Sequence, residues 1–167
     1  SLLEVGGAEQ LQVKDCAGLL PFHQAASYNG NVEVLLLLLE VGGDEQLQAK
    51  DSEGNLPVHR AAFSNNSVEV MRLLLLSRLA VGGPKQLQVK DSNGDLPIHL
   101  AASENSSVEV VRLLLEVGGA EQLQVKNSDG DLPIHLASFQ NSSVEVVRFL
   151  LEVGGAEQLQ VKDSRGR

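Results

Sequence analysis

Aromatic residues and cysteine are scarce in this chain of 167 residues. Aromatic side chains make up 3% of the sequence, with no tryptophan and one tyrosine, which suits a core of thin aliphatic layers. Cys16 is the only cysteine, and this excludes a disulfide bond within the chain. Because structural disulfides belong to oxidising compartments, we expect an intracellular and cytoplasmic protein.

Long apolar runs and positive charge are also scarce. The longest apolar run, residues 34–39, covers six residues, whereas a helix needs about 20 to cross a bilayer. We therefore expect no direct insertion into a membrane. Lysine and arginine number 13 against 22 aspartates and glutamates, which gives a formal net charge of −9. Because this charge repels phosphate backbones, we do not expect nucleic acid as a partner.

One phrase recurs along the chain. It is clearest in residues 91–126, which read DSNGDLPIHLAASENSSVEVVRLLLEVGGAEQLQVK. The lysines that close the copies lie 36, 40, 36 and 36 residues apart, at Lys14, Lys50, Lys90, Lys126 and Lys162. A period of about 20–50 residues is typical of stacked-repeat proteins.

We therefore predict a single repeat domain over residues 1–167. Copies one to four cover residues 15–50, 51–90, 91–126 and 127–162, with the end of a preceding copy in residues 1–14 and the start of a further copy in residues 163–167. Because both ends fall within a copy, we expect the chain to be an excerpt from a longer protein or array.

Copy three holds the features of a known repeat. Residues 96–102 read LPIHLAA, residues 108–116 form the aliphatic segment VEVVRLLLE, and Gly118 and Gly119 follow. This pattern resembles the ankyrin repeat, whose hallmark is T-P-L-H-x-A and whose usual length is about 33 residues. The resemblance implies an all-α repeat solenoid of stacked helix-turn-helix units with hairpin-like fingers. It also implies that partners are held on the concave first-helix surface, and that the histidine ties neighbouring turns together by hydrogen bonds.

Local signals place two helices in each copy. A proline opens the first helix, where its missing N–H costs nothing. The second helix, residues 108–116 in copy three, is apolar almost all round, so it must be buried on several sides. Gly-Gly then ends this helix. Ser106 with Glu109, and Ser142 with Glu145, have the spacing of a capping box for the second helix.

The copies depart from ordinary ankyrin units in three respects. Leucine replaces the threonine before proline, so we predict that packing and the nearby Asp95 or Asp131 support the start of the first helix. Extra residues between the helices and in the Gly-Gly-Ala-Glu-Gln-Leu-Gln-Val-Lys connection should lengthen the fingers. Copy two is four residues longer, and alignment places the insertion in its second helix, residues 70–81.

No group of residues points to catalysis or to a cofactor. The chain lacks the G-x-G-x-x-G, P-loop, H-E-x-x-H and G-x-S-x-G motifs. Its histidines sit at one equivalent place in each copy, and stacked helices stand about 8–10 Å apart, whereas zinc ligands lie about 2 Å from the metal. We therefore interpret His23, His59, His99 and His135 as structural. Cys16 is interpreted as inert, because serine fills its place in the other copies.

Three Asn-X-Ser sequences begin at Asn65, Asn105 and Asn141. In a secreted chain such sequences accept glycans. We interpret them as turn and cap residues, because asparagine and serine favour loops and helix starts. Glycans at these sites would overturn the intracellular assignment.

Positions at which the copies differ are the candidates for recognition. They fall at the finger tips and along the first helix, and the partner-binding residues that we predict are Gln24, Tyr28, Glu53, Asn55, Arg60, Phe63, Asn93, Asp95, Glu104, Asp129, Asp131 and Phe139. Tyr28, Phe63 and Phe139 are the expected anchors, because protein interfaces favour aromatic side chains. Packing between copies is the alternative role for these three.

Two hypotheses for function follow. In the first, the chain is a non-catalytic protein–protein interaction module or scaffold, without a cofactor, that binds another protein or another part of its parent chain. In the second, it is a structural spacer or a docked subunit of a larger assembly or membrane-protein complex. Loss of a partner on Tyr28→Ala with Phe63→Ala would favour the first hypothesis.

Overall fold

The computed structural model describes residues 7–76, 83–163 and 165–166. Every element of regular secondary structure in these residues is a helix. The first helices of the copies are α2 (Pro21–Tyr28), α4 (Pro57–Ser64), α6 (Pro97–Glu104) and α8 (Pro133–Gln140). The second helices are α3 (Val32–Gly42), α5 (Val68–Leu76), α7 (Val108–Gly118) and α9 (Val144–Gly154). Shorter helices are α1 (Gly7–Gln10) and the 3-10 helices η1 (Asp44–Gln48), η2 (Gly83–Gln88), η3 (Ala120–Gln124) and η4 (Ala156–Gln160).

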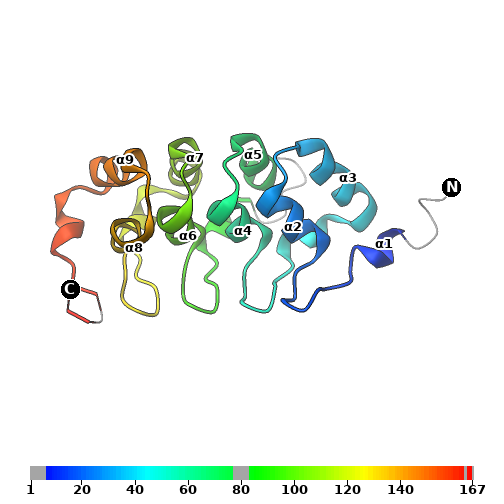
Figure 1. The fold of residues 1–167 in the computed structure, drawn as a ribbon, viewed down its shortest axis with the longest axis horizontal. Helices are drawn as coiled ribbons and strands as arrows, with labels where there is room; N and C mark the ends of the chain where they lie inside the picture. Colours follow the sequence, from blue (N-terminus) through cyan, green and yellow to red (C-terminus); the bar gives the residue numbers. More distant parts are fainter. Residues whose placement is uncertain (1–6, 77–82, 164, 167) are drawn as a thin grey trace.

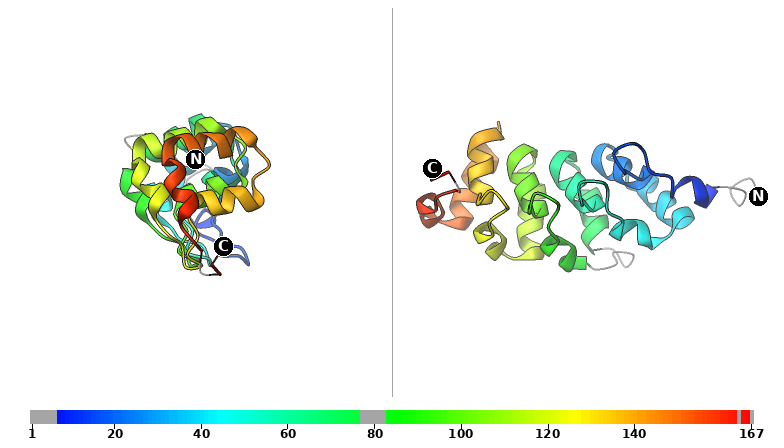
Figure 2. Two further views of the ribbon diagram at one scale, coloured as in Figure 1. Left: turned by 90° about the vertical axis from the view of Figure 1, so that its left-hand side faces the viewer. Right: turned by 90° about the horizontal axis from the view of Figure 1, so that it is seen from below.

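The helices stack in two rows along the long axis of the molecule. The first helices form one row and the second helices the other, and the fingers project from the first-helix row (Figures 1 and 2). Small residues let the first helices pack closely, since Ala61 and Ala102 are fully buried. Leu74 of α5 and Leu114 of α7 are buried in the same core. The prediction of an all-α repeat solenoid is confirmed.

A histidine completes the start of each first helix. The N-cap residue is a leucine, which offers no side-chain hydrogen bond, and a proline follows it. In copy three the Leu96 N–H donates to Nδ1 of His99 at 3.2 Å, and the same bond recurs in the other copies at 2.9–3.2 Å. Our prediction that Asp95 or Asp131 supports this helix start is wrong. The Asp95 carboxylate instead accepts a hydrogen bond from Asn127 at 2.8 Å.

The second helices begin one residue later than the capping-box spacing predicted. Ser107 and Ser143 are the N-cap residues, and the Ser107 hydroxyl accepts from the Val110 N–H at 3.3 Å. The predicted caps at Ser106 and Ser142 are therefore wrong by one position. Acidic residues do lie in the first turn, where the helix dipole favours negative charge.

The two glycines after a second helix have separate roles. At Gly118 a Cβ would overlap the side chain of Gln122, whereas Gly119 has a φ of 88°, which favours glycine. Gln122 is buried, and its Nε2 donates to the carbonyls of Leu114 at 3.1 Å and of Gly119 at 3.0 Å. These bonds satisfy carbonyls at the helix end. The connection therefore folds as η3 against the stack, and the prediction that it lengthens the finger is wrong.

The fingers are hydrogen-bonded to one another along the array. Within copy two, the Asp51 N–H donates to the Asn55 carbonyl at 3.0 Å and closes a hairpin-like loop. Between copies, the Ser92 N–H donates to the Glu53 carbonyl at 2.9 Å, and the equivalent bond recurs one copy further on. The fingers thus reinforce the stacking of the helices.

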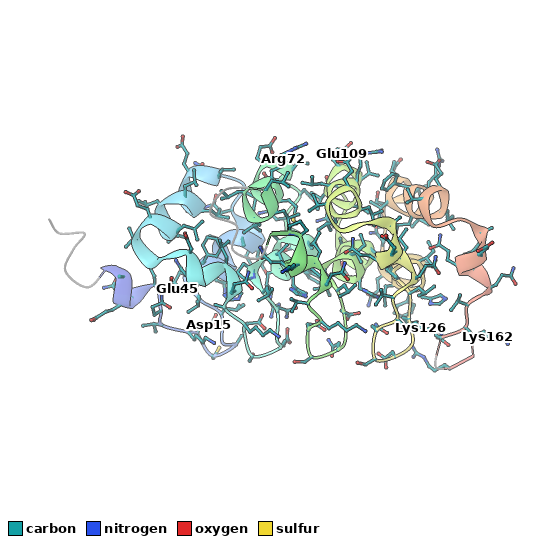
Figure 3. The ribbon with its side chains drawn as sticks, turned by 180° about the vertical axis from the view of Figure 1, so that it is seen from behind. Asp15, Glu45, Arg72, Glu109, Lys126 and Lys162 are labelled. Carbon is teal, nitrogen blue, oxygen red and sulfur yellow. The ribbon has the colours of Figure 1, made fainter. Side chains whose placement is uncertain are left out.

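The fingers and the second helices form opposite edges of the molecule. At the finger edge, where Asp15 and Lys126 lie, Nζ of Lys90 donates to the Lys126 carbonyl at 2.8 Å (Figure 3). Arg72 and Glu109 lie at the opposite edge, on α5 and α7 (Figure 3). A residue on one edge can therefore serve as a control for a residue on the other.

The predicted lengthening of the second helix in copy two falls partly outside the described residues. α5 ends at Leu76, and residues 77–82 are not described. In the described part of the chain, none of the helices has the length and apolar character needed to cross a membrane.

Candidate functional site

The histidines have structural roles. His99 is buried, and its Nδ1 accepts the Leu96 N–H, so the ring hydrogen is on Nε2, which donates to the Val125 carbonyl at 3.0 Å. Burial lowers the pKa of His59 and of His99 to about 4, because the charged imidazole is poorly solvated there. Within the described ranges, no three His, Cys, Asp or Glu side chains are placed to hold a metal ion. The predicted tying role of histidine is confirmed.

A ladder of asparagines, buried at Asn65 and Asn105 and half-buried at Asn141, also joins the copies, and the sequence analysis missed it. Nδ2 of Asn105 donates to the carbonyls of Ala62 at 2.9 Å and Asn65 at 3.1 Å, and its Oδ1 accepts from the Ser107 N–H at 2.8 Å. Asn65 and Asn141 make the equivalent bonds to their own neighbours. The available signal was an asparagine at the same place in every copy.

The same hydrogen bonds determine whether the Asn-X-Ser sequences can carry a glycan in the folded chain. A glycan would be attached to the asparagine side-chain amide. In Asn65 and Asn105 that amide nitrogen belongs to a buried side chain and already donates two hydrogen bonds. The interpretation of these asparagines as turn residues is confirmed, and a glycan is incompatible with the folded ladder.

The twelve predicted partner-binding residues fall into two groups. Gln24, Tyr28, Glu53, Phe63, Asn93, Glu104, Asp129 and Phe139 are exposed, and Arg60 is half-buried. Asn55, Asp95 and Asp131 are buried. These three can meet a partner only where a cavity reaches them.

Copy two neutralises the carboxylates of its own finger. Arg60 extends from α4, and its guanidinium donates to Asp51 at 2.7 Å and to Glu53 at 2.8 Å. Burial would raise the pKa of the Asp51 carboxyl, but hydrogen bonds from the Asn55 backbone and from Arg60 outweigh it and lower that pKa. The sequence signal for this pair is that Arg60 and Glu53 occur in the same copy.

Copies three and four have no arginine at this place. Leu100 and Leu136 occupy the position of Arg60. Burial raises the pKa of Asp95 to about 6, and the surrounding carboxylates add to this effect against the hydrogen bond from Asn127. Negative charge in this part of the finger edge is therefore less well compensated than in copy two.

A hollow of about 420 Å³ opens beside α8. Leu136 and Phe139 contribute apolar surface, and Asp129, Asp131 and Asp163 contribute carboxylates. Arg165 adds a positive charge to the same lining, and its Nε lies 3.7 Å from Oδ2 of Asp163.

Comparison with known proteins places the chain in a family. The model for ankyrin repeats (3 copies) matches residues 1–82 and 75–163, which together cover nearly the whole chain. A search of curated proteins finds no match. Ankyrin repeats are generally protein–protein interaction modules and are typically non-catalytic. The helix stack and the family match agree, and the chain therefore belongs to the ankyrin repeat family.

Proposed function

We propose that the chain binds another protein through its first-helix face, and that it needs no cofactor to do so. We define this face as the exposed side chains of α2, α4, α6 and α8 together with the adjoining finger tips. Exposed aromatic residues carry the proposal. Tyr28 is 77% exposed, Phe139 is 79% exposed and Phe63 is 40% exposed, and all three lie near the ends of first helices.

Exposed aromatics of this kind are unusual for a chain in which aromatic residues make up only 3%. Aromatic side chains supply much of the binding energy in protein interfaces, because they bury a large apolar area with little loss of conformational freedom. The structure uses none of these three rings to fill the core. The exposure of Tyr28 and Phe63, which lie in copies that another copy follows, favours contact with a partner over packing between copies.

Affinity capture from extracts of the source cells, using the immobilised chain, tests the proposal. We expect a captured protein whose binding falls at least about tenfold with Tyr28→Ala and Phe139→Ala together, because anchors of this kind are worth about 2 kcal/mol or more. The matched control is Leu37→Ala with Val144→Ala, which removes two exposed apolar side chains from the second helices.

Binding that survives the aromatic substitutions, or that falls equally with the control substitutions, would refute the choice of the first-helix face. If no captured protein depends on either face, the chain acts as a spacer. Circular dichroism of each variant shows whether the fold is retained.

A further inference from the structure

Each first helix places its fourth, seventh and eighth residues on the first-helix face, because residues three and four apart in a helix lie on the same side. These residues are Gln24, Ser27 and Tyr28 in copy one, Arg60, Phe63 and Ser64 in copy two, and Leu100, Ser103 and Glu104 in copy three. The first helices stack in one row (Figure 1). The three sets therefore lie side by side along the array.

One side chain of each set is aromatic or aliphatic, and its place shifts from copy to copy. Tyr28 is the eighth residue of α2, Phe63 is the seventh of α4 and Leu100 is the fourth of α6. Each first helix begins next to its finger, so these residues approach the fingers from copy one to copy three. We call Tyr28, Phe63 and Leu100 the diagonal stripe.

The stripe keeps open surface although its copies are stacked. Phe63 lies between copies one and three and is 40% exposed. Leu100 lies between copies two and four and is half-buried. Neighbouring copies on both sides thus leave part of each side chain uncovered, and a partner can reach it.

Polar side chains with a net negative charge border the stripe. On the finger side, Gln24 donates to the Asp15 carboxylate at 3.2 Å and Arg60 donates to Glu53 at 2.8 Å. On the other side lies Glu104, which is exposed. Arg60 is the only lysine or arginine of α2, α4 and α6, and carboxylates of its own finger neutralise it. The borders therefore favour a partner with positive charge beside its apolar residues.

The spacing of the stripe matches a helix. Stacked helices lie about 8–10 Å apart, and seven residues of an α-helix span about 10.5 Å and return to the same side of it. An extended segment covers that distance in about three residues, which places successive contacts on opposite sides. A helix also satisfies its own backbone groups, which suits a stripe that offers few hydrogen bonds.

We propose that the partner protein presents an amphipathic helix to the diagonal stripe, with apolar residues at every seventh position and lysine or arginine beside them. The apolar residues contact Tyr28, Phe63 and Leu100 in turn, and the basic residues lie over the negative borders. The inference rests on the proposed function. It adds the kind of partner and a further binding residue, Leu100.

Selection of random peptides of about 20 residues, displayed on phage, against the immobilised chain tests the inference; this length spans three helical contacts. We expect the selected peptides to repeat an apolar residue at every seventh position, with lysine or arginine next to it. Fluorescence anisotropy of a labelled synthetic copy of the best peptide gives its dissociation constant. The circular dichroism of the mixture should show more helix than the sum of the separate spectra.

A variant of copy three separates the stripe from aromatic content alone. Leu100→Gln with Glu104→Tyr gives copy three the residues that copy one has at these places, Gln24 and Tyr28. This moves the apolar side chain of copy three about 6 Å along α6, away from the stripe, although it adds an aromatic ring to the face. We expect the affinity for the peptide to fall at least about tenfold, because one anchor is lost.

Two single substitutions accompany this variant. Leu100→Ala should weaken peptide binding at least about threefold. The matched control is Leu36→Ala, which removes an exposed leucine from α3 in the second-helix row and should change the affinity less than about twofold. Circular dichroism of each variant without peptide shows whether the fold is retained.

The outcomes separate this inference from the proposed function. If the selected peptides are rich in proline, are acidic or lack the seven-residue repeat, or if they bind the copy-three variant as tightly as the original chain, the inference is overturned. Peptides that are lost with Tyr28→Ala and Phe139→Ala but not with the copy-three variant would overturn the inference and leave the proposed function intact. Absence of any peptide that depends on the first-helix face would contradict both.

Discussion

Replacing Asn105 by alanine tests how the copies are held together. Its side chain is 1% exposed and makes three hydrogen bonds, two to carbonyls of copy two and one to the Ser107 N–H. Each such bond contributes about 0.5–1.5 kcal/mol net, and its loss costs more when it leaves a buried group unpaired. We expect Asn105→Ala to lower the free energy of unfolding by about 2–4 kcal/mol.

Urea unfolding followed by far-UV circular dichroism measures this change. Asn66→Ala is the matched control, because Asn66 is exposed and its side chain makes no hydrogen bond within the part of the chain that the structure describes. We expect the control to change the free energy of unfolding by less than about 0.5 kcal/mol. Asn105→Asp keeps the acceptor for Ser107 but turns a carboxylate towards two carbonyl oxygens, so it should destabilise the protein more than alanine does.

The cooperativity of urea unfolding is a second measurement on the Asn105→Ala protein, because the lost hydrogen bonds lie between two copies. Stacked repeats are stabilised mainly through contacts between neighbours, and Asn105 joins copy two to copy three. The Asn105→Ala protein should therefore unfold less cooperatively, with a lower dependence of the free energy on urea concentration. If Asn105→Ala and Asn66→Ala had the same effect, the ladder would carry no net stability and the reasoning would be refuted.

Three further predictions concern other contacts. Gly94→Ala should lower the free energy of unfolding by about 1–3 kcal/mol, because Gly94 has a φ of 77° and a Cβ would lie 2.8 Å from a backbone nitrogen of the next finger. The control is Gly30→Ala, which has open space around the added Cβ and should leave the free energy of unfolding nearly unchanged in the same urea assay. Arg60→Ala should cost about 1–3 kcal/mol at pH 7, because the fully buried Asp51 carboxylate loses its ion pair and keeps only its hydrogen bonds from Glu53 and Asn55. An unchanged melting temperature would contradict this. In the folded chain the pKa of His59 and of His99 is about 4, against an ordinary value of 6.5. Below pH 6.5 the unfolded chain therefore takes up protons that the folded chain does not. As the pH falls towards 4, each histidine should lower the free energy of unfolding by about 2–4 kcal/mol. Urea titrations at pH 7 and 4.5 measure that loss, and His99→Gln should make it smaller.

Signals that lie within one copy predicted the fold well. Proline marked the first helix, Gly-Gly marked the end of the second helix, and the repeat period indicated stacking. The errors concern hydrogen-bond partners that residue type and sequence spacing did not identify. Leucine at the N-cap suggested an aspartate as substitute, but the imidazole of His99 reaches back to the Leu96 N–H. Adjacent serines offered two possible caps, and spacing alone selected Ser106 instead of Ser107.

The buried polar residues were harder to predict. Gln122 and Asn105 have side chains that are usually exposed, and both lie in polar stretches of the sequence. Gln122 is buried because it satisfies carbonyls at the end of α7. Asn105 is buried because it satisfies carbonyls of the preceding copy. The burial of both residues was indicated by the recurrence of the same amide residue at the same place in every copy, since a solvent-exposed position would accept many other polar residues.

Variation between copies is an incomplete guide to the binding surface. It selected Tyr28 and Phe139, which are exposed, but it also selected Asn55, which is buried and donates to the carboxylates of its own finger. A residue can vary either because it meets a partner or because a neighbour within the copy has changed with it. Arg60 and Glu53 are an instance of the second case.

The two kinds of variation become distinguishable once the neighbours are known. Where arginine is present, in copy two, the finger carboxylates are paired internally and offer little to a ligand. Where leucine is present, in copy four, the Asp131 carboxylate receives no hydrogen bond from the residues that the structure describes, and it lies next to apolar surface. Leu136→Arg should place a guanidinium beside Asp129 and Asp131 in copy four, as Arg60 lies beside Asp51 and Glu53 in copy two. A gain in the free energy of unfolding, measured by urea titration, would show that the new arginine pairs with those carboxylates.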